Sequence, residues 1–172
     1  RTSFWTRWSH VGSLAGDARI LVPLVAATAT VLVIRHRWRM ASFVVQAGLA
    51  EALAYTVTVS MVHRDRPFVR QLDHYNPRHS FPSSHTAAAT AVYVAVALLL
   101  TAHFTGRGAR IAIWAVAVVL PVDVAFARMY RGEHHPIDVG AGGLMGVGAV
   151  VVALFAARTA RAVAERRAEV SR

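Results

Sequence analysis

Three separate stretches of the sequence are rich in arginine, histidine and serine, and each one adjoins a long apolar run. They cover residues 63–67, 81–86 and 128–138. Arginine binds phosphate through its charge and its planar array of N–H donors, and histidine can serve as a nucleophile or an acid near neutral pH. Side chains of these types at the edge of a membrane indicate chemistry on phosphorylated lipids.

The third stretch has the most demanding spacing. His134 and Asp138 are four positions apart, so they share one helix face if the helical turn that Pro136 begins reaches back to His134. An aspartate that bonds one imidazole nitrogen leaves the other nitrogen free to attack. Arg128, at the end of the preceding apolar run, would reach the same pocket. A lone histidine near a helix end is more often a cap or solvent-exposed, but the accompanying charges favour a nucleophile here.

The second stretch stands at the start of an apolar run. Helix N-termini present free N–H groups and the positive end of the helix dipole, which together bind anions. Ser83 and Ser84 can add hydroxyl donors, and His85 is placed to protonate a departing oxygen. Serine is also a common N-cap residue, and that structural role is compatible with phosphate binding.

The first stretch supplies two further cations. Arg64 and Arg66 offer guanidinium groups to phosphate oxygens, although arginines at the end of a span can equally be interfacial anchors. The loop that begins with this stretch runs over residues 63–84. Loops of this length are uncommon unless they are functional or disordered. Because two of the three stretches lie at its ends, a functional loop is favoured.

Long apolar runs must position these stretches. The chain has 172 residues, of which 55% are hydrophobic and 16% are charged. Candidate spans lie at residues 20–34, 40–62, 85–104, 111–126 and 137–157. A bilayer core requires a helix of about 20 residues, so the first and fourth runs must extend into flanking residues or tilt. The sequence therefore predicts an all-α, polytopic transmembrane bundle in a single domain, with glycines that allow close helix packing in the last span.

The charge pattern orients this bundle. All 19 basic residues are arginine, and the formal net charge is +10. The arginines lie at span ends and in short loops instead of on one soluble basic face, so nucleic acid is not the expected partner. By the positive-inside rule, the turns at 35–39 and 107–110 and the basic tail at 158–172 are cytoplasmic. All three stretches then lie on the extracytoplasmic face of the cell membrane.

The first residues of the chain lack the pattern of a signal peptide. Residues 1–19 mix aromatic and polar side chains, which is typical of a segment at the membrane interface; an ordinary loop is the alternative. The chain has no cysteine, so disulfides and thiolate metal sites are excluded.

Taken together, the three stretches resemble a known signature. Arg-Pro at 66–67, Pro-Ser-Ser-His at 82–85 and Arg-x5-His-x3-Asp at 128–138 are similar to the motifs of the type-2 phosphatidic acid phosphatase (lipid phosphate phosphatase) superfamily, in its bacterial membrane form. The resemblance covers residues 59–143. Members usually have six spans, which implies a further span upstream of residue 1.

The resemblance implies a role for each matching residue. His134 would attack phosphorus and become a phosphohistidine, Asp138 would orient it, and His85 would protonate the leaving group. The phosphate oxygens would be bound by Arg66, Arg128, Ser83 and the backbone around Ser84. Water would then hydrolyse the intermediate, and the family uses no metal and no other cofactor.

Three positions depart from the family pattern. A lysine normally stands seven residues before the motif arginine, where this chain has Val59; a glycine is usual at Ser84 and a serine at Ala127. Loss of a phosphate-binding cation implies weakened catalysis, because a hydrogen bond to a charged group contributes about 1.5–3 kcal/mol. Arg64 or His63 is a candidate replacement for the lysine.

The sequence therefore favours an integral-membrane phosphatase that acts on a phosphomonoester or diphosphate of a lipid, with membrane lipids as its partners. Candidate substrates are polyprenyl phosphates or diphosphates, phosphatidylglycerol phosphate and phosphatidic acid. A catalytically weak or silent binder of phosphorylated lipids is the alternative, because of the departures from the family pattern. A histidine-lined metal transporter is disfavoured, since its potential ligands gather at one membrane face: His74, His79, His85, Glu133, His134 and His135. The oligomeric state stays open.

Overall fold

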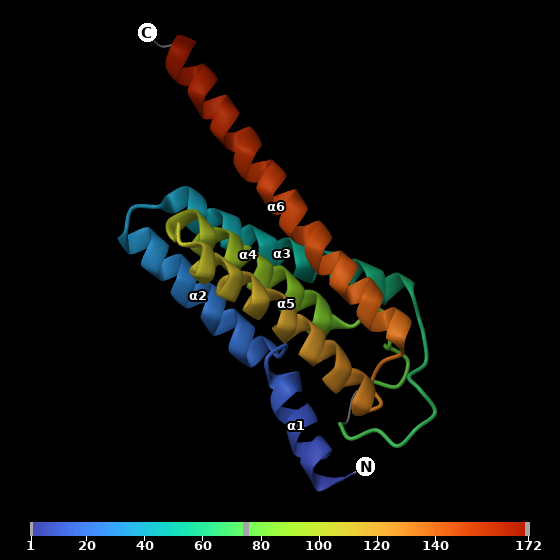
Figure 1. The fold of residues 1–172 in the computed structure, drawn as a ribbon. Coiled ribbons are helices and arrows are strands. Elements are labelled where there is room, and N and C mark those ends of the chain that lie inside the picture. Colours follow the sequence, from blue (N-terminus) through green and yellow to red (C-terminus); the bar gives the residue numbers. More distant parts are fainter. Residues whose placement is uncertain (1, 74–75, 171–172) are drawn as a thin grey trace.

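The protein is a bundle of α-helices, seen here in a computed structural model that describes residues 2–73 and 76–170. Its helices in chain order (Figure 1) are α1 (Ser3–Leu14), α2 (Ala18–Ile34), α3 (Trp38–Met61), α4 (Ser84–His103), α5 (Arg107–Tyr130) and α6 (Pro136–Val170). Arg1 of the expected interfacial segment, His74 of the disfavoured metal site and Arg172 of the basic tail lie outside the described residues.

The five predicted spans are confirmed as helices. Five helical stretches of the described chain are long and apolar enough to cross a membrane, the first of them running over α1 and α2. The two short apolar runs do extend into flanking residues, as α2 and α5 show. Helix α6 continues through the described part of the predicted basic tail, as far as Val170, and projects beyond the rest of the bundle (Figure 1).

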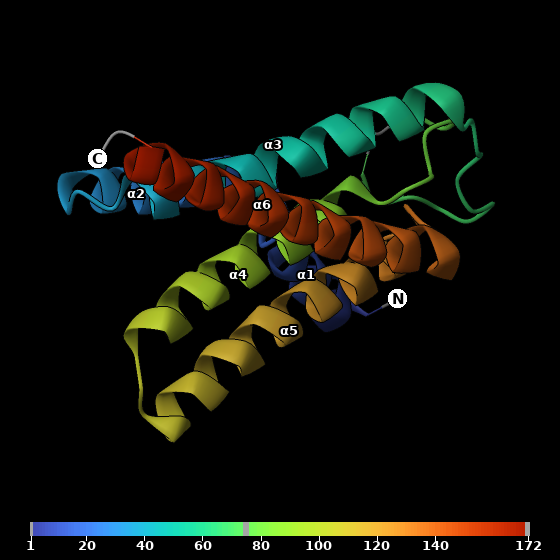
Figure 2. The ribbon, with the colours of Figure 1, turned by 90° about the horizontal axis from the view of Figure 1, so that it is seen from above.

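Helix α4 lies at the centre of the bundle and packs against α3, α5 and α6. Figure 2 shows α6 running between α3 and α4. Two glycines make the approach of α6 to α4 possible. A Cβ atom on Gly142 would lie 2.6 Å from the carbonyl oxygen of Ser83, and one on Gly146 would lie 2.5 Å from that of Ala87. The prediction of close packing through the glycines of the last span is confirmed at these two positions.

The three phosphate-handling stretches meet at one end of the bundle. They stand where α3 and α5 end and where α4 and α6 begin, whereas the α2–α3 and α4–α5 turns lie at the opposite end (Figure 1). The loop between α3 and α4 folds back on itself, with the N–H of Arg64 donating to the carbonyl of Arg78 and the N–H of Ser80 donating to the carbonyl of Arg64. Helix α1 packs on α5 at this same end.

Candidate active site

The third stretch turns back over the C-terminus of α5. Gly132 has a φ of 80°, the left-handed conformation that glycine adopts readily after a helix. The N–H of Gly132 donates to the carbonyl of Met129 at 3.0 Å, and the N–H of Glu133 donates to that of Arg128 at 3.1 Å. This pair of bonds forms a Schellman motif. It turns the chain inward, so that Glu133 and His134 are buried.

At the start of α6, Asp138 ties the three stretches together. Pro136 is the first helical residue, as predicted. The Asp138 carboxylate accepts the N–H of His135 at 2.8 Å, the Ser80 hydroxyl at 2.5 Å and Nη1 of Arg64 at 2.9 Å. The Asp138 side chain is fully buried. Arg64, considered as a replacement for the missing lysine, is therefore an ion-pair partner of Asp138.

The His134 ring is held by a backbone carbonyl. Its Nδ1 lies 2.7 Å from the carbonyl oxygen of Ser80. Because a carbonyl can only accept, Nδ1 carries the proton and Nε2 carries the lone pair. The nearest carboxylate oxygen of Asp138 is 3.9 Å from Nδ1, so the expected direct hydrogen bond between them is not formed. Asp138 instead fixes Ser80, whose carbonyl orients the imidazole.

His134 is a neutral imidazole in this setting. Burial, followed by the positive charges of Arg128 and Arg66, lowers the pKa of His134 to about 3. All of these causes disfavour the imidazolium form. A buried, neutral ring with a lone pair on Nε2 is the form that a histidine nucleophile requires.

This protonation state gives a first prediction. NMR ring signals of His134, assigned by their loss in His134→Ala, should remain those of the Nδ1–H neutral tautomer from about pH 8 down to about pH 5. An ordinary histidine gains its proton over this range, at a pKa of about 6.5. A protonation midpoint near 6.5 for His134 would contradict the buried geometry.

Arg66 is held by the protein on each of its nitrogens. Nε donates to the carbonyl of Asn76 at 2.9 Å, and Nη2 donates to the carbonyl of His79 at 3.0 Å. Nη1 donates to the carbonyl of Glu133 at 2.6 Å and to its carboxylate at 2.9 Å. The guanidinium plane is thus fixed by the α3–α4 loop and by the third stretch together.

Glu133 lies between two arginines. Its side chain is fully buried, and Oε2 is 2.9 Å from Nη1 of Arg66 and 4.0 Å from Nη2 of Arg128. Its other oxygen accepts the N–H of Asp73 at 3.2 Å. From the sequence alone, the role suggested for Glu133 is that of a metal ligand. Its position beside two predicted phosphate-binding cations gives it a different role, which is to fix their guanidinium groups.

Asp73 completes the network from the loop. Its carboxylate accepts from Nη1 of Arg128 at 3.1 Å and from both Nε and Nη2 of Arg131. Burial alone would raise the pKa of Asp73, but the hydrogen bonds and positive charges of Arg131 and Arg128 outweigh burial and hold the pKa below its usual value. Asp73 is therefore an anion at neutral pH.

Helix α1 contributes hydroxyls to the same arginines. Ser13 accepts from Nη1 of Arg128 at 3.1 Å, and Ser9 accepts from Nη1 of Arg131 at 3.3 Å. The two serines are four positions apart, so they share one face of α1. The segment predicted to be interfacial therefore also lines the site, and the serine spacing was the signal that could have shown it.

The second stretch begins α4 as predicted. Ser83 is its N-cap, with its hydroxyl 3.5 Å from the N–H of Thr86, and its own N–H donates to the carbonyl of Asp138. Ser84 and His85 follow in the first turn and are half-buried. His85 is two residues from this N-cap, at the end of α4 that meets the third stretch.

The structure therefore brings every predicted site residue to one end of the bundle: His134, His85, Asp138, Arg66, Arg128, Arg64, Ser83 and Ser84. It also brings to this end residues for which the sequence predicts no individual role in phosphate binding: Asp73, Glu133, Arg131, Ser80, Ser9 and Ser13. Within residues 2–73 and 76–170, no three or more histidine, aspartate and glutamate side chains are grouped so that they could hold a metal ion.

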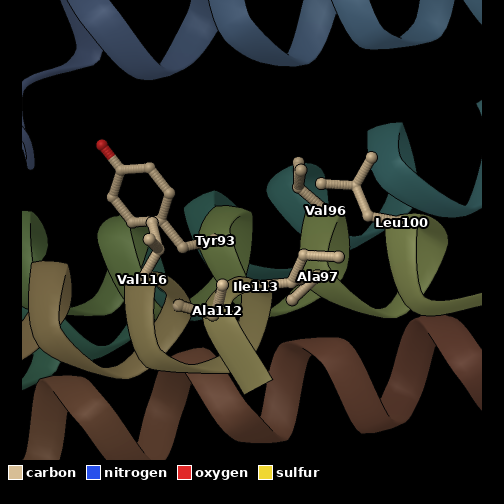
Figure 3. A pocket seen from close by; sticks show the side chains of 8 residues that line it. Tyr93, Val96, Ala97, Leu100, Ala112, Ile113 and Val116 are labelled. Atoms are coloured by element: carbon tan, nitrogen blue, oxygen red, sulfur yellow. The ribbon is translucent and has the colours of Figure 1, made fainter. Parts of the chain in front are cut away.

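A separate cavity of about 280 Å³ lies between α4 and α5 and is lined by apolar side chains around Tyr93 (Figure 3). The Tyr93 hydroxyl donates to the carbonyl of Ala15 at 2.9 Å. None of the three stretches lines this cavity, so it is not the phosphate site. Its apolar lining suits hydrocarbon.

Known proteins resemble this chain in sequence. It is 29% identical over 144 residues to the putative undecaprenyl-diphosphatase YbjG of Escherichia coli (strain K12), covering 78% of this chain and 65% of that protein. It is 27% identical to undecaprenyl-diphosphatase BcrC of Bacillus subtilis (strain 168), covering 86% and 74%. It is 29% identical to phosphatidylglycerophosphatase B of Bacillus subtilis (strain 168), covering 77% and 65%. The chain thus spans just under two thirds of the length of YbjG and of phosphatidylglycerophosphatase B.

Two solved structures share the fold. The transmembrane PAP2-type phosphatidylglycerolphosphate phosphatase of Bacillus subtilis superimposes with a TM-score of 0.83 at 23% identity, covering 92% of this chain and 79% of that one. Aquifex aeolicus LpxE superimposes with a TM-score of 0.71 at 22% identity, covering 90% and 87%. The model of the PAP2 superfamily matches residues 41–162, a range that contains all three stretches. The chain belongs to the PAP2 superfamily.

Proposed function

We propose that this protein is a metal-independent phosphatase that hydrolyses a lipid phosphate or diphosphate through a phosphohistidine at His134. One observation carries the proposal: Nδ1 of His134 donates to the Ser80 carbonyl and leaves Nε2 as a lone-pair nitrogen. The positive charges that act on this ring come from Arg128 and Arg66. A nucleophile beside fixed cations is the arrangement that phosphoryl transfer requires.

The membrane-spanning helices and the relatives together support a lipid substrate. Two relatives are named as undecaprenyl-diphosphatases and one as a phosphatidylglycerophosphatase. We therefore favour a polyprenyl phosphate or diphosphate, ahead of phosphatidylglycerol phosphate and phosphatidic acid. The arginine-rich turns and the basic end of α6 lie opposite the site, which supports an extracytoplasmic active site by the positive-inside rule.

In the first chemical step, Nε2 of His134 attacks phosphorus. A P–N bond forms while the P–O bond to the lipid breaks, and His85 donates a proton to the departing oxygen. Arg66, Arg128, Ser83 and the N–H groups at the start of α4 bind the equatorial oxygens, where charge develops.

In the second step, water attacks the phosphohistidine. His85, now neutral, takes a proton from the water; the P–N bond breaks and inorganic phosphate leaves with the new oxygen. Asp138 acts throughout by holding Ser80 and Arg64, so that the His134 ring keeps its orientation.

Phosphate release tests this function. Detergent-purified protein should release inorganic phosphate from at least one of a panel that contains polyprenyl diphosphate, polyprenyl phosphate, phosphatidylglycerol phosphate and phosphatidic acid. Activity should survive EDTA, because arginines supply the positive charge that a metal ion would otherwise provide. Vanadate, which adopts the trigonal-bipyramidal shape of phosphoryl transfer, should inhibit.

Loss of activity in EDTA that zinc or magnesium restores would overturn the metal-free mechanism. Binding of these lipids without phosphate release would favour the alternative, a catalytically silent binder of phosphorylated lipids. The departures at Val59 and Ser84 are the features that keep this alternative in view.

A further inference from the structure

Carboxylates of the protein already engage the arginines of the site. Four guanidinium groups and three carboxylates form ion pairs at this end of the bundle: Arg64, Arg66, Arg128, Arg131, Asp73, Glu133 and Asp138. Four positive charges against three negative charges leave one positive charge in excess. A phosphate monoester carries about 1.5–2 negative charges at neutral pH. Carboxylates of the protein therefore neutralise part of this positive charge before any phosphate binds.

The three carboxylates differ in how firmly they are held. The side chains of Glu133 and Asp138 are fully buried, whereas 23% of the Asp73 side chain is exposed. Asp138 also accepts from a hydroxyl and a backbone N–H, whereas the Asp73 carboxylate accepts from the guanidinium groups of Arg128 and Arg131. Asp73 is thus the carboxylate that an incoming anion can reach and replace.

We propose that Asp73 is an internal anion that occupies the phosphate-binding side of Arg128 and gives way to the phosphate of the substrate, and so limits the affinity of the site. This inference rests on the proposed function, because it takes Arg128 to be a phosphate ligand. It assigns to the α3–α4 loop a residue that sets KM, distinct from the residues that perform the chemistry.

The geometry shows why a phosphate can take the place of this carboxylate. Arg131 donates hydrogen bonds from Nε and Nη2 to the two carboxylate oxygens of Asp73, and Nη1 of Arg128 is a third donor. A guanidinium group binds carboxylate and phosphate through the same paired donors. Ser13 and Ser9 accept from these arginines separately, so the arginines remain anchored to α1 when Asp73 moves away.

Binding of inorganic phosphate to the detergent-purified full chain, measured by calorimetry, tests the inference without turnover. Asp73→Asn keeps the size of the side chain and removes its charge. We expect it to bind phosphate about fivefold more tightly than the parent, because a unit charge at about 4 Å is worth about 1 kcal/mol even in water. Unchanged or weaker binding would overturn the proposal.

Asp65→Asn is the matched control. Asp65 is an exposed acid of the same loop, and its backbone carbonyl accepts from Nε2 of His135. Its substitution changes the net charge by the same amount but leaves the arginine network alone. Phosphate affinity should therefore stay at the parent value. An equal gain in both variants would show a general charge effect and would refute a specific role for Asp73.

A chemical restoration of the charge covers the case in which Asp73→Asn does not fold. The chain has no cysteine, so Asp73→Cys carries the only thiol. Its adduct with a methyl methanethiosulfonate is neutral, and its adduct with a sulfonatoethyl methanethiosulfonate is an anion. The neutral adduct should bind phosphate more tightly than the anionic adduct. Equal affinities would contradict the inference.

The two proposals fail in different ways. If the parent releases no phosphate from any lipid of the panel, the proposed function fails, while the phosphate affinities still decide the role of Asp73. If the parent is active and Asp73→Asn binds phosphate no better, the role of Asp73 alone is refuted.

Discussion

His134→Ala should abolish turnover, whereas His135→Ala should leave most of it. Removal of an enzyme nucleophile costs about 10⁴-fold or more in kcat, and the His134 ring is buried with its Nδ1 2.7 Å from the Ser80 carbonyl. The side chain of His135 is only half-buried, and its Nε2 is 3.3 Å from the carbonyl of Asp65. Losing that contact should cost about tenfold at most. Phosphate release from one lipid phosphate measures both variants.

This prediction has two controls: the folding of both variants and the detection of the phosphorylated intermediate. Both variants should remain monodisperse in detergent, because the alanine at 135 keeps the backbone N–H that Asp138 accepts. Protein quenched during turnover should carry an acid-labile phosphate that is absent from His134→Ala. Comparable losses in the two variants would show that the nucleophile has been assigned to the wrong imidazole.

The fold was largely predictable, because each span is a local property of the sequence. Apolar runs define the five membrane helices, and caps such as Ser83 and the turn at Gly132 follow from the conformational preferences of serine and glycine. The boundaries shifted where charged residues continue a helix. Helix α6 runs on to Val170 because its arginines and glutamates are good helix formers, although they end the apolar run.

The site was predictable only where a motif carries it. The spacing of His134 and Asp138 correctly joined these two residues, but the expected bond between them assumed that both stand on α6. That helix begins at Pro136, so His134 lies before it and its ring turns to the Ser80 carbonyl instead. Spacing cannot show this outcome, because the carbonyl belongs to a loop more than 50 residues away.

The roles of Asp73 and of the α1 serines could not be predicted either, because they depend on contacts between distant parts of the chain. Asp73 is one acid in a polar loop, and nothing in its local sequence indicates that it forms an ion pair with Arg131. Ser9 and Ser13 belong to a helix whose aromatic residues suggested a purely interfacial role. These contacts depend on how α1 and the loop dock against the end of α5, which is a property of the assembled bundle.

Removal of the Glu133 carboxylate should have the largest effect on stability. Glu133→Ala leaves the buried guanidinium groups of Arg66 and Arg128 without the carboxylate that lies 2.9 Å from one and 4.0 Å from the other. Breaking a buried ion pair by removing one partner typically costs about 3–5 kcal/mol in the free energy of unfolding. Thermal unfolding in detergent should therefore show a large fall in melting temperature, together with loss of phosphate release.

An exposed ion pair on α6 is the control for this prediction. It tests whether the loss of any ion pair lowers the melting temperature, or only the loss of a buried one. Glu165 accepts from Nε of Arg161 at 2.7 Å, but both side chains are more than half exposed, and exposed ion pairs contribute little. Glu165→Ala should leave the melting temperature unchanged. Glu133→Gln, which keeps an acceptor oxygen for Arg66, should recover part of the stability that alanine loses. Equal melting temperatures for Glu133→Ala and the parent would mean that Glu133 does not position the two arginines, and that Arg66 is held by its carbonyl partners and Arg128 by Ser13 and Asp73.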